Sequence, residues 1–124
     1  MKSIETKNAP TPIGPYSQAT IAGGFVFVSG QVGKNPVSGA MINDSIKSEA
    51  RQVMENVKAV LEAAGSNLSK VAKTNIFLTN MDDFAQVNEV YGSFFTGNYP
   101  ARETVQVSRL PLNANVEISV IAEQ

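Results

Sequence analysis

Apolar residues recur at helical spacing in one long stretch of the chain. Asp44 or Ser45 can cap a helix at the start of this stretch, and Gly65 stands where a left-handed C-terminal cap belongs. The apolar positions between them are Ile46, Ala50, Val53, Met54, Val57, Leu61 and Ala64. Because this spacing follows the 3.6-residue period of an amphipathic helix, the sequence predicts a helix over residues 45–64.

A second apolar stripe predicts a shorter helix. Asn80 can cap it, and the carboxylates of Asp82 and Asp83 suit the positive N-terminal end of a helix. The stripe consists of Phe84, Val87, Tyr91, Phe94 and Phe95. We expect Gly97 and Pro100 to end this helix.

The remaining apolar runs are short and rich in β-branched and aromatic residues, which is typical of strands. They cover residues 2–6, 18–22, 25–29, 71–79, 103–109 and 114–122. Gly23-Gly24 predicts a tight hairpin between the second and third strands. The fourth run indicates a strand buried on both faces, and the short turn at 110–113 suggests that the last two strands pair antiparallel.

This order of elements predicts an α+β fold with one mixed sheet of about six strands. Each helix connects two strands, and right-handed crossovers place both helices on one face of that sheet. Several strands carry apolar residues on both faces, so the uncovered face would expose a hydrophobic patch in a monomer. Association of subunits through the sheet resolves this exposure. The alternative is that these residues are isolated, half-exposed side chains.

Length and charge limit the class of protein. A chain of 124 residues with 43% apolar and 17% charged residues can form a single globular domain spanning 1–124. The net charge is −1 and no window concentrates basic residues, so neither nucleic acid nor an anionic membrane is an expected partner. No apolar run reaches the roughly 18 residues of a membrane span, and no signal-peptide pattern occurs at the N-terminus. A cytoplasmic location is therefore expected.

The chain has no cysteine and no histidine, which excludes several kinds of chemistry. Thiol nucleophiles, zinc–thiolate sites and Ser-His catalysis are impossible. Asp82 and Asp83 are adjacent carboxylates, but at a helix start they fit the role of dipole partners better than that of metal ligands. We expect no metal and no cofactor, so catalysis would depend on carboxylates, hydroxyl groups, arginine or the backbone.

Two charged residues on predicted strands are candidates for chemistry. Arg102 begins a strand after a proline turn, and its planar fork can grip a carboxylate through two charge-assisted hydrogen bonds. An ion pair within the chain explains Arg102 equally well. Glu117 lies in an otherwise apolar strand, where burial would raise its pKa and make it a possible acid or base. Its alternative role is a structural salt bridge with Arg109.

Many short motifs in this order resemble the Rid (YjgF) family of reactive-intermediate deaminases, from about residue 4 to residue 122. The motifs are Ala9-Pro10, Ile13-Gly-Pro-Tyr16, Ser29-Gly-Gln31, Asn56-Val-Lys58-Ala-Val, Glu62-Ala-Ala-Gly65, Asp83-Phe84, Asn88, Tyr91, Phe94-Phe95, Pro100-Ala-Arg102 and Val116-Glu-Ile118. The resemblance implies a chorismate-mutase-like fold and a homotrimer. The sheets of such a trimer form a central barrel, the helices lie outside, and three sites lie at subunit interfaces.

The resemblance also implies a reaction and the residues that perform it. Arg102 would bind the carboxylate of a small substrate, and Glu117 would activate the attacking water. The matching pocket positions are Tyr16, Ser29, Gly30, Asn88 and Thr104, several of them contributed by a neighbouring subunit. The implied reaction hydrolyses an enamine or imine, such as 2-aminoacrylate, to a 2-oxo acid and ammonia.

The chain departs from the family pattern at a few positions. Glu103 and Thr104 stand where many members have serine and cysteine, Gly33 replaces a frequent proline, and the loop before Tyr99 is shorter than in some relatives. Glu103 should point away from the Thr104 side of the strand, but folding back onto Arg102 would make it compete with an anionic substrate. Two other functions stay open: a non-catalytic module that binds 2-oxo acids, and RNA binding or cleavage, which the near-neutral charge disfavours.

Overall fold

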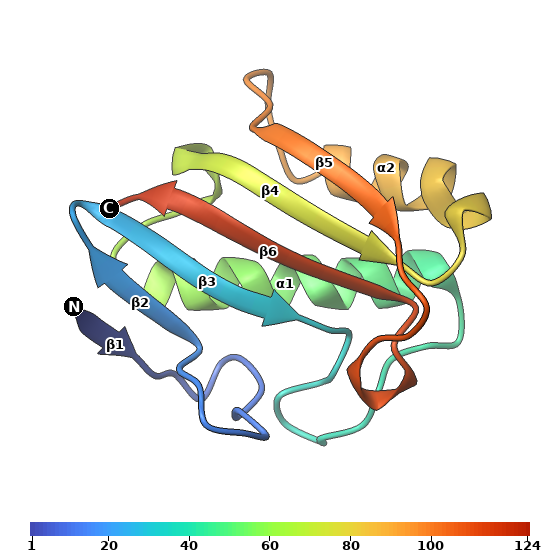
Figure 1. Cartoon of the computed structure of the whole chain (residues 1–124), viewed down its shortest axis with the longest axis horizontal. Helices are drawn as coiled ribbons and strands as arrows, with labels where there is room; N and C mark the ends of the chain where they lie inside the picture. Colours follow the sequence, from blue (N-terminus) through green and yellow to red (C-terminus); the bar gives the residue numbers. More distant parts are fainter.

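The computed structural model describes all 124 residues, and its six strands form one mixed sheet (Figure 1). The strands are β1 (Lys2–Ile4), β2 (Ala19–Ala22), β3 (Phe25–Gln31), β4 (Val71–Leu78), β5 (Ala101–Gln106) and β6 (Val116–Glu123). They lie in the order β1-β2-β3-β6-β4-β5. Only β4 and β5 run parallel; every other neighbouring pair is antiparallel. The predicted α+β class and the two helices on one face are confirmed.

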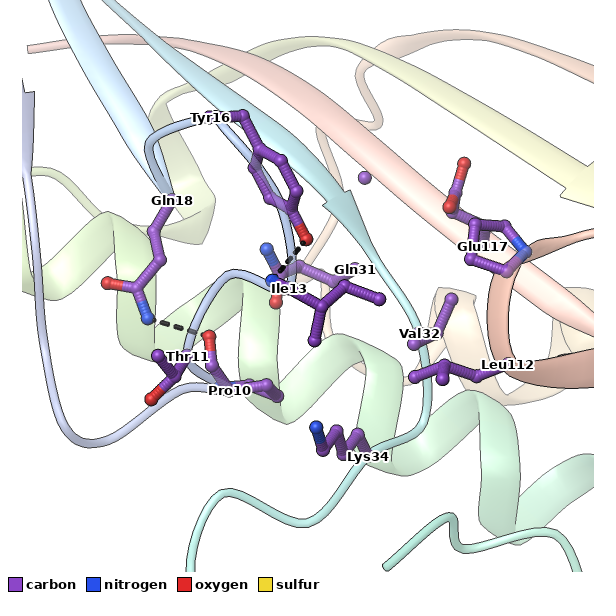
Figure 2. A pocket seen from close by; sticks show the side chains of 12 residues that line it. Pro10, Thr11, Ile13, Tyr16, Gln18, Gln31, Val32, Lys34, Leu112 and Glu117 are labelled. Atoms are coloured by element: carbon purple, nitrogen blue, oxygen red, sulfur yellow. Dashed lines mark hydrogen bonds between the residues drawn. The ribbon is translucent and has the colours of Figure 1, made fainter. Parts of the chain in front are cut away.

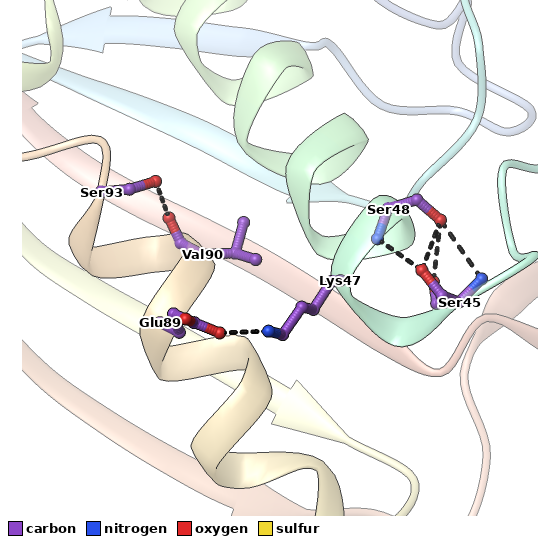
Figure 3. A network of polar contacts seen from close by, with 6 residues as sticks. All are labelled: Ser45, Lys47, Ser48, Glu89, Val90 and Ser93. Atoms are coloured by element: carbon purple, nitrogen blue, oxygen red, sulfur yellow. Dashed lines mark hydrogen bonds and ion pairs between the residues drawn. The ribbon is translucent and has the colours of Figure 1, made fainter.

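Helix α1 (Ile46–Ala63) confirms the longer predicted helix to within a residue at each end. Ser45 caps it: its hydroxyl accepts the backbone N–H of Ser48, and the Ser48 hydroxyl accepts the backbone N–H of Ser45. Figure 3 shows this reciprocal pair, and beside it an exposed ion pair between Lys47 and Glu89 that joins the two helices. Lys47 holds the pKa of the Glu89 carboxyl below its ordinary value.

Helix α2 (Phe84–Gly92) is shorter than expected. A 3₁₀ turn (Met81–Asp83) precedes it, and the helix ends at Gly92 rather than near Gly97. The Ser93 hydroxyl donates to the Val90 carbonyl oxygen at 2.6 Å and so satisfies one of the terminal carbonyls (Figure 3). Phe95 lies beyond the helix but still packs into the core, with its ring centroid 4.8 Å from that of Tyr91.

The last two strands do not pair with each other, so that prediction was wrong. Strand β6 lies between β3 and β4, and β5 is the edge strand beyond β4. The reason is burial: four alternate residues of β6 are almost inaccessible, whereas no residue of β5 is fully buried. The more apolar strand therefore takes the centre of the sheet, and the nine residues 107–115 are long enough to pass across β4.

The two faces of the sheet differ sharply. The face toward the helices carries the core, including Val26, Ile76 and Ile118, each at most 1% exposed. The other face has no layer over it, and Phe25 and Phe27 there are each 41% exposed. Strand β4 is fully buried only on the helix side, which corrects the expectation of burial on both faces. An uncovered apolar face is confirmed for the single chain.

No helix is both long and apolar enough to cross a membrane.

One buried polar contact fastens α2 to the sheet. The Tyr91 hydroxyl donates to the Thr74 hydroxyl oxygen at 2.9 Å, and these residues are 4% and 0% exposed. Burial raises the pKa of Tyr91, so the phenol stays protonated and remains a donor.

We predict that Tyr91→Phe lowers the free energy of unfolding by about 1–2 kcal/mol, because it leaves the buried Thr74 hydroxyl without its donor. Thr74→Val should cost a similar amount, and the double variant should cost clearly less than the sum of the two. Urea unfolding at one fixed protein concentration measures all four proteins. Strictly additive losses would contradict a direct contact between the two hydroxyl groups.

Candidate functional site

Three loops meet at one end of the sheet and enclose a cavity of about 60 Å³, which we call the Glu117 pocket (Figures 1 and 2). They are the loop before β2, the loop after β3 and the turn before β6. The lining residues are Pro10, Thr11, Ile13, Tyr16, Gln18, Gly30, Gln31, Val32, Lys34, Pro111, Leu112 and Glu117. Most of these lining residues are apolar or uncharged. The charged ones are Lys34, which is basic, and Glu117, which is acidic.

Glu117 reaches this pocket because of the alternation along β6. Val116 and Ile118 point into the core beneath the helices, so Glu117 between them points to the uncovered face. It makes no ion pair, and the salt bridge with Arg109 that the sequence left open does not occur. Burial raises the pKa of the Glu117 carboxyl. A partly desolvated carboxylate without a cation is suited to accept a proton.

Gly30 permits the close approach of Glu117. Strand β3 has a bulge between Val28 and Gln31, which pair with Val120 and Ile118 of β6. A Cβ at position 30 would lie 2.7 Å from the carboxyl carbon of Glu117 and 2.8 Å from one of its oxygens. Glycine is therefore required if the carboxylate is to keep this place.

Ser29 has a structural role within the single chain. Its hydroxyl donates to the Ser17 carbonyl oxygen at 2.6 Å, and its backbone N–H donates to the Gln18 carbonyl oxygen at 2.9 Å. These bonds fasten the bulge to the loop that carries Tyr16. The structure thus places Ser29 behind the pocket wall rather than among the lining residues.

The loop that carries Tyr16 is held by Gln18, which the sequence analysis did not single out. Gln18 is 2% exposed; its side chain accepts the backbone N–H of Thr6 and donates to backbone oxygens of Thr6, Ala9 and Pro10 at 2.9–3.2 Å. Tyr16 itself is 49% exposed, and Figure 2 shows it on the wall opposite Glu117. Gln18 directly precedes β2, and its bonds reach back to residues 6–10, so the local sequence pattern gives no signal of this role.

Leu112 closes the pocket on the β6 side and lies in the left-handed region, with φ of 60° and ψ of 25°. This conformation costs a non-glycine residue on the order of 1–2 kcal/mol. Asn113 also has a positive φ, 53°. Two such residues in succession persist only where the neighbouring structure holds the turn in place.

Arg102 lies in a different hollow, which we call the Arg102 pocket. Its lining residues are Asn88, Tyr91, Gly92, Tyr99, Pro100 and Arg102, and its volume is about 300 Å³. The Arg102 guanidinium lies 5.1 Å from the ring centroid of Tyr91 and 5.7 Å from that of Phe84, within cation–π range. It makes no ion pair, so its hydrogen-bonding fork has no carboxylate partner in the chain.

The residues that follow Arg102 face opposite ways. Glu103 forms an ion pair with Lys73 at 2.7 Å on the uncovered face, so it does not fold back onto the guanidinium. Thr104 shares the face of Arg102, and its hydroxyl oxygen is buried without any hydrogen-bond partner. A buried hydroxyl without a partner is uncommon and carries a cost of roughly 1–3 kcal/mol.

The sequence-predicted site residues therefore fall into two groups. Tyr16, Gly30 and Glu117 share one pocket, while Arg102 and Asn88 share the other. Arg102 pairs with Thr74 of β4 and Glu117 pairs with Phe77, three residues further along. From strand spacing and rise, their Cα atoms lie roughly 14 Å apart, with side chains on opposite faces. A single chain does not bring Arg102 and Glu117 together.

No three acidic side chains cluster as metal ligands.

Comparisons with known proteins show the family and the fold of the chain. Residues 6–124 match the family model described as endoribonuclease L-PSP. A 2-iminobutanoate/2-iminopropanoate deaminase of Dermatophagoides farinae is 49% identical over 118 residues, 95% of this chain and 92% of the relative. The structure of RidA from an Antarctic Psychrobacter superimposes with a TM-score of 0.96 at 43% identity over the whole of both chains.

Another solved structure is that of Escherichia coli TdcF with bound serine. It has a TM-score of 0.96 and 43% identity, and the match covers 100% of this chain and 99% of that one. The family model and these relatives span almost the entire sequence, with the same fold. The chain therefore belongs to the YjgF/Rid family, the one described by the endoribonuclease L-PSP model.

Proposed function

We propose that this protein hydrolyses imines and enamines of small 2-amino acids, such as 2-iminopropanoate, to 2-oxo acids and ammonia. The observation that carries the proposal is a pair of charged groups without partners. Arg102 presents a guanidinium that makes no ion pair, and Glu117 presents a half-buried carboxylate that makes none either. Such groups are costly in a fold unless a ligand uses them.

Arg102 would bind the substrate carboxylate. The aromatic rings of Tyr91 and Phe84 hold the guanidinium in place. Its N–H groups remain free for a bidentate contact with the carboxylate. The serine bound in the related TdcF structure supports a small ligand that carries a carboxylate. The Glu117 pocket, with about 60 Å³, likewise suits a substrate of a few heavy atoms.

Glu117 would act on water. It removes a proton from the water as the water oxygen bonds to the imine carbon, and the substrate nitrogen gains a proton. In the resulting carbinolamine the hydroxyl group loses its proton and forms the carbonyl double bond as the carbon–nitrogen bond breaks. The nitrogen gains a proton in this step and leaves as ammonia. The imine carbon is already electrophilic, so positioning of substrate, water and base supplies what the reaction requires.

Because the two groups lie on opposite faces of one sheet, a complete site requires two subunits. We propose a homotrimer in which Arg102 of one subunit meets Glu117 of the next. The exposed Phe25 and Phe27 on the uncovered face support burial of that face against other copies of the chain. Such an interface would complete a site three times around the trimer.

The direct test is the rate at which an imine, generated in place by an amino-acid oxidase, is converted to its 2-oxo acid. Wild type should accelerate the conversion, while Arg102→Ala and Glu117→Gln should each lower kcat/KM by about 100-fold or more. Glu103→Gln, which alters the neighbouring exposed carboxylate, is the matched control and should stay near wild type. Binding of 2-oxo acids without any acceleration would instead identify a binding module, and cleavage of RNA an endoribonuclease.

The activity should also depend on pH in a defined direction. Glu117 accepts a proton only when ionised, so the rate falls as pH drops through its pKa. Since burial raises that pKa, the acid limb of kcat/KM should lie above the range of an ordinary glutamate, about 4.3. The residual kcat/KM of Glu117→Gln should not show this decrease at acid pH. A wild-type profile flat down to pH 4 would rule out Glu117 as the base.

Mixing two inactive variants tests whether the site is shared between subunits. Arg102→Ala and Glu117→Gln, unfolded together in equal amounts and refolded, should regain about a quarter of wild-type activity. The expected fraction is one half times one half, since each site draws one group from each of two randomly chosen subunits. A mixture no more active than the two variants refolded separately would mean that one subunit supplies both groups.

A further inference from the structure

Glu49 is a completely buried carboxylate that the proposed reaction does not use. It lies in the first turns of α1 and is 0% exposed. Its two oxygens accept separate hydrogen bonds from Asn115, one from the backbone N–H at 2.7 Å and one from the side-chain amide at 2.8 Å. No cation pairs with it. A buried carboxylate held only by one asparagine is unusual and calls for a reason.

Glu49 also shapes the loop after β3. A Cβ at Gly33 would lie 2.9 Å from Cγ of Glu49 and 3.1 Å from its backbone oxygen. Position 33 therefore has to be glycine while Glu49 occupies this place. A proline there, with its own Cβ, would make the same close contacts with Glu49.

Both segments that Glu49 touches continue into the wall of the Glu117 pocket. Val32 and Lys34 line the pocket, while Gly33 between them faces Glu49. On the other segment, Leu112 and Glu117 line the pocket, while Asn115 between them binds Glu49. The Glu49 side chain thus lies behind both parts of the wall: its carboxylate binds Asn115 before β6, and its Cγ lies close to Gly33 in the loop after β3.

We infer that Glu49 is a positioning residue for the Glu117 pocket, fixing the start of β6 and hence the place of the Glu117 carboxylate. The inference rests on the proposed function for its effect on rate, but its contacts are independent of it. Asn56 of α1 also holds the loop after β3, donating to the Val32 and Lys34 carbonyl oxygens at 2.9 Å. Among the side-chain hydrogen bonds of α1, only those of Glu49 reach the segment that leads into the strand carrying the base.

The test compares Glu49→Leu, Glu49→Gln and Val60→Ala. Leucine fills the space but cannot accept the two Asn115 bonds; glutamine can accept one and, if the Asn115 amide turns over, donate the other. Val60 is a 0% exposed core residue of α1 that lines neither pocket, so Val60→Ala controls for lost stability. We expect Glu49→Leu to lower kcat about 10-fold or more with KM within about twofold, because Arg102 on β5 is untouched.

Glu49→Gln should keep at least about half of the wild-type kcat, and Val60→Ala should keep nearly all of it below its unfolding transition. A purely structural Glu49 would instead give Glu49→Leu the same kcat as Val60→Ala, which would overturn the inference. The rate comparison applies only if wild type hydrolyses imines, so a second measurement does not depend on activity.

Hydrogen exchange of the Asn115 backbone amide provides that measurement. In Glu49→Leu it should exchange at least about 10-fold faster than in wild type, while Val60→Ala leaves it near the wild-type rate. Equal exchange in wild type and Glu49→Leu would show that Glu49 does not fix this segment. If wild type is inactive but the Asn115 amide shows the expected exchange pattern, the proposed function is contradicted. The role of Glu49 in fixing the Asn115 segment is then still supported.

Discussion

The arrangement of this molecule depends on the central place of β6 and on the alternation of side chains along it. Hydrogen bonds to β3 and β4 hold both edges of β6. Neither its register nor the side of the sheet to which each of its side chains points can therefore change without disrupting the whole sheet. Val116, Ile118 and Val120 are then committed to the core beneath the helices. The same alternation turns Glu117 outward to the uncovered face, where the bulge at Gly30 makes room for it.

That constraint also separates the two charged groups. Arg102 lies on the helix side of β5 with the rings of α2, and Glu117 lies on the opposite side of β6. Neither group has a counterion, and placing them in one pocket of a monomer would favour their pairing with each other. In the single chain their separation leaves the guanidinium without a carboxylate partner and the carboxylate without a cation partner.

The sequence predicted what depends on local pattern. The 3.6-residue spacing and the Ser45 cap located α1, and Arg102 and Glu117 stood out as charges on strands that lack an obvious solvated face. The Gly23-Gly24 turn correctly predicted the pairing of β2 with β3. The places of β5 and β6 were not predicted: a short segment joins them, yet β4 separates them, because burial across the whole sheet decides the strand order. The roles of Gln18 and Glu49 were missed for a similar reason, since each acts on a segment distant in sequence.

The most direct test of the central claim is a crystal structure of the assembled protein with a bound 2-oxo acid such as 2-oxobutanoate, the product that mimics the substrate. We predict that its carboxylate binds Arg102 of one subunit through two hydrogen bonds, with the carbonyl carbon within about 4 Å of the Glu117 carboxylate of another subunit. A ligand bound to Arg102 with no Glu117 from any subunit near its carbonyl carbon would contradict the account.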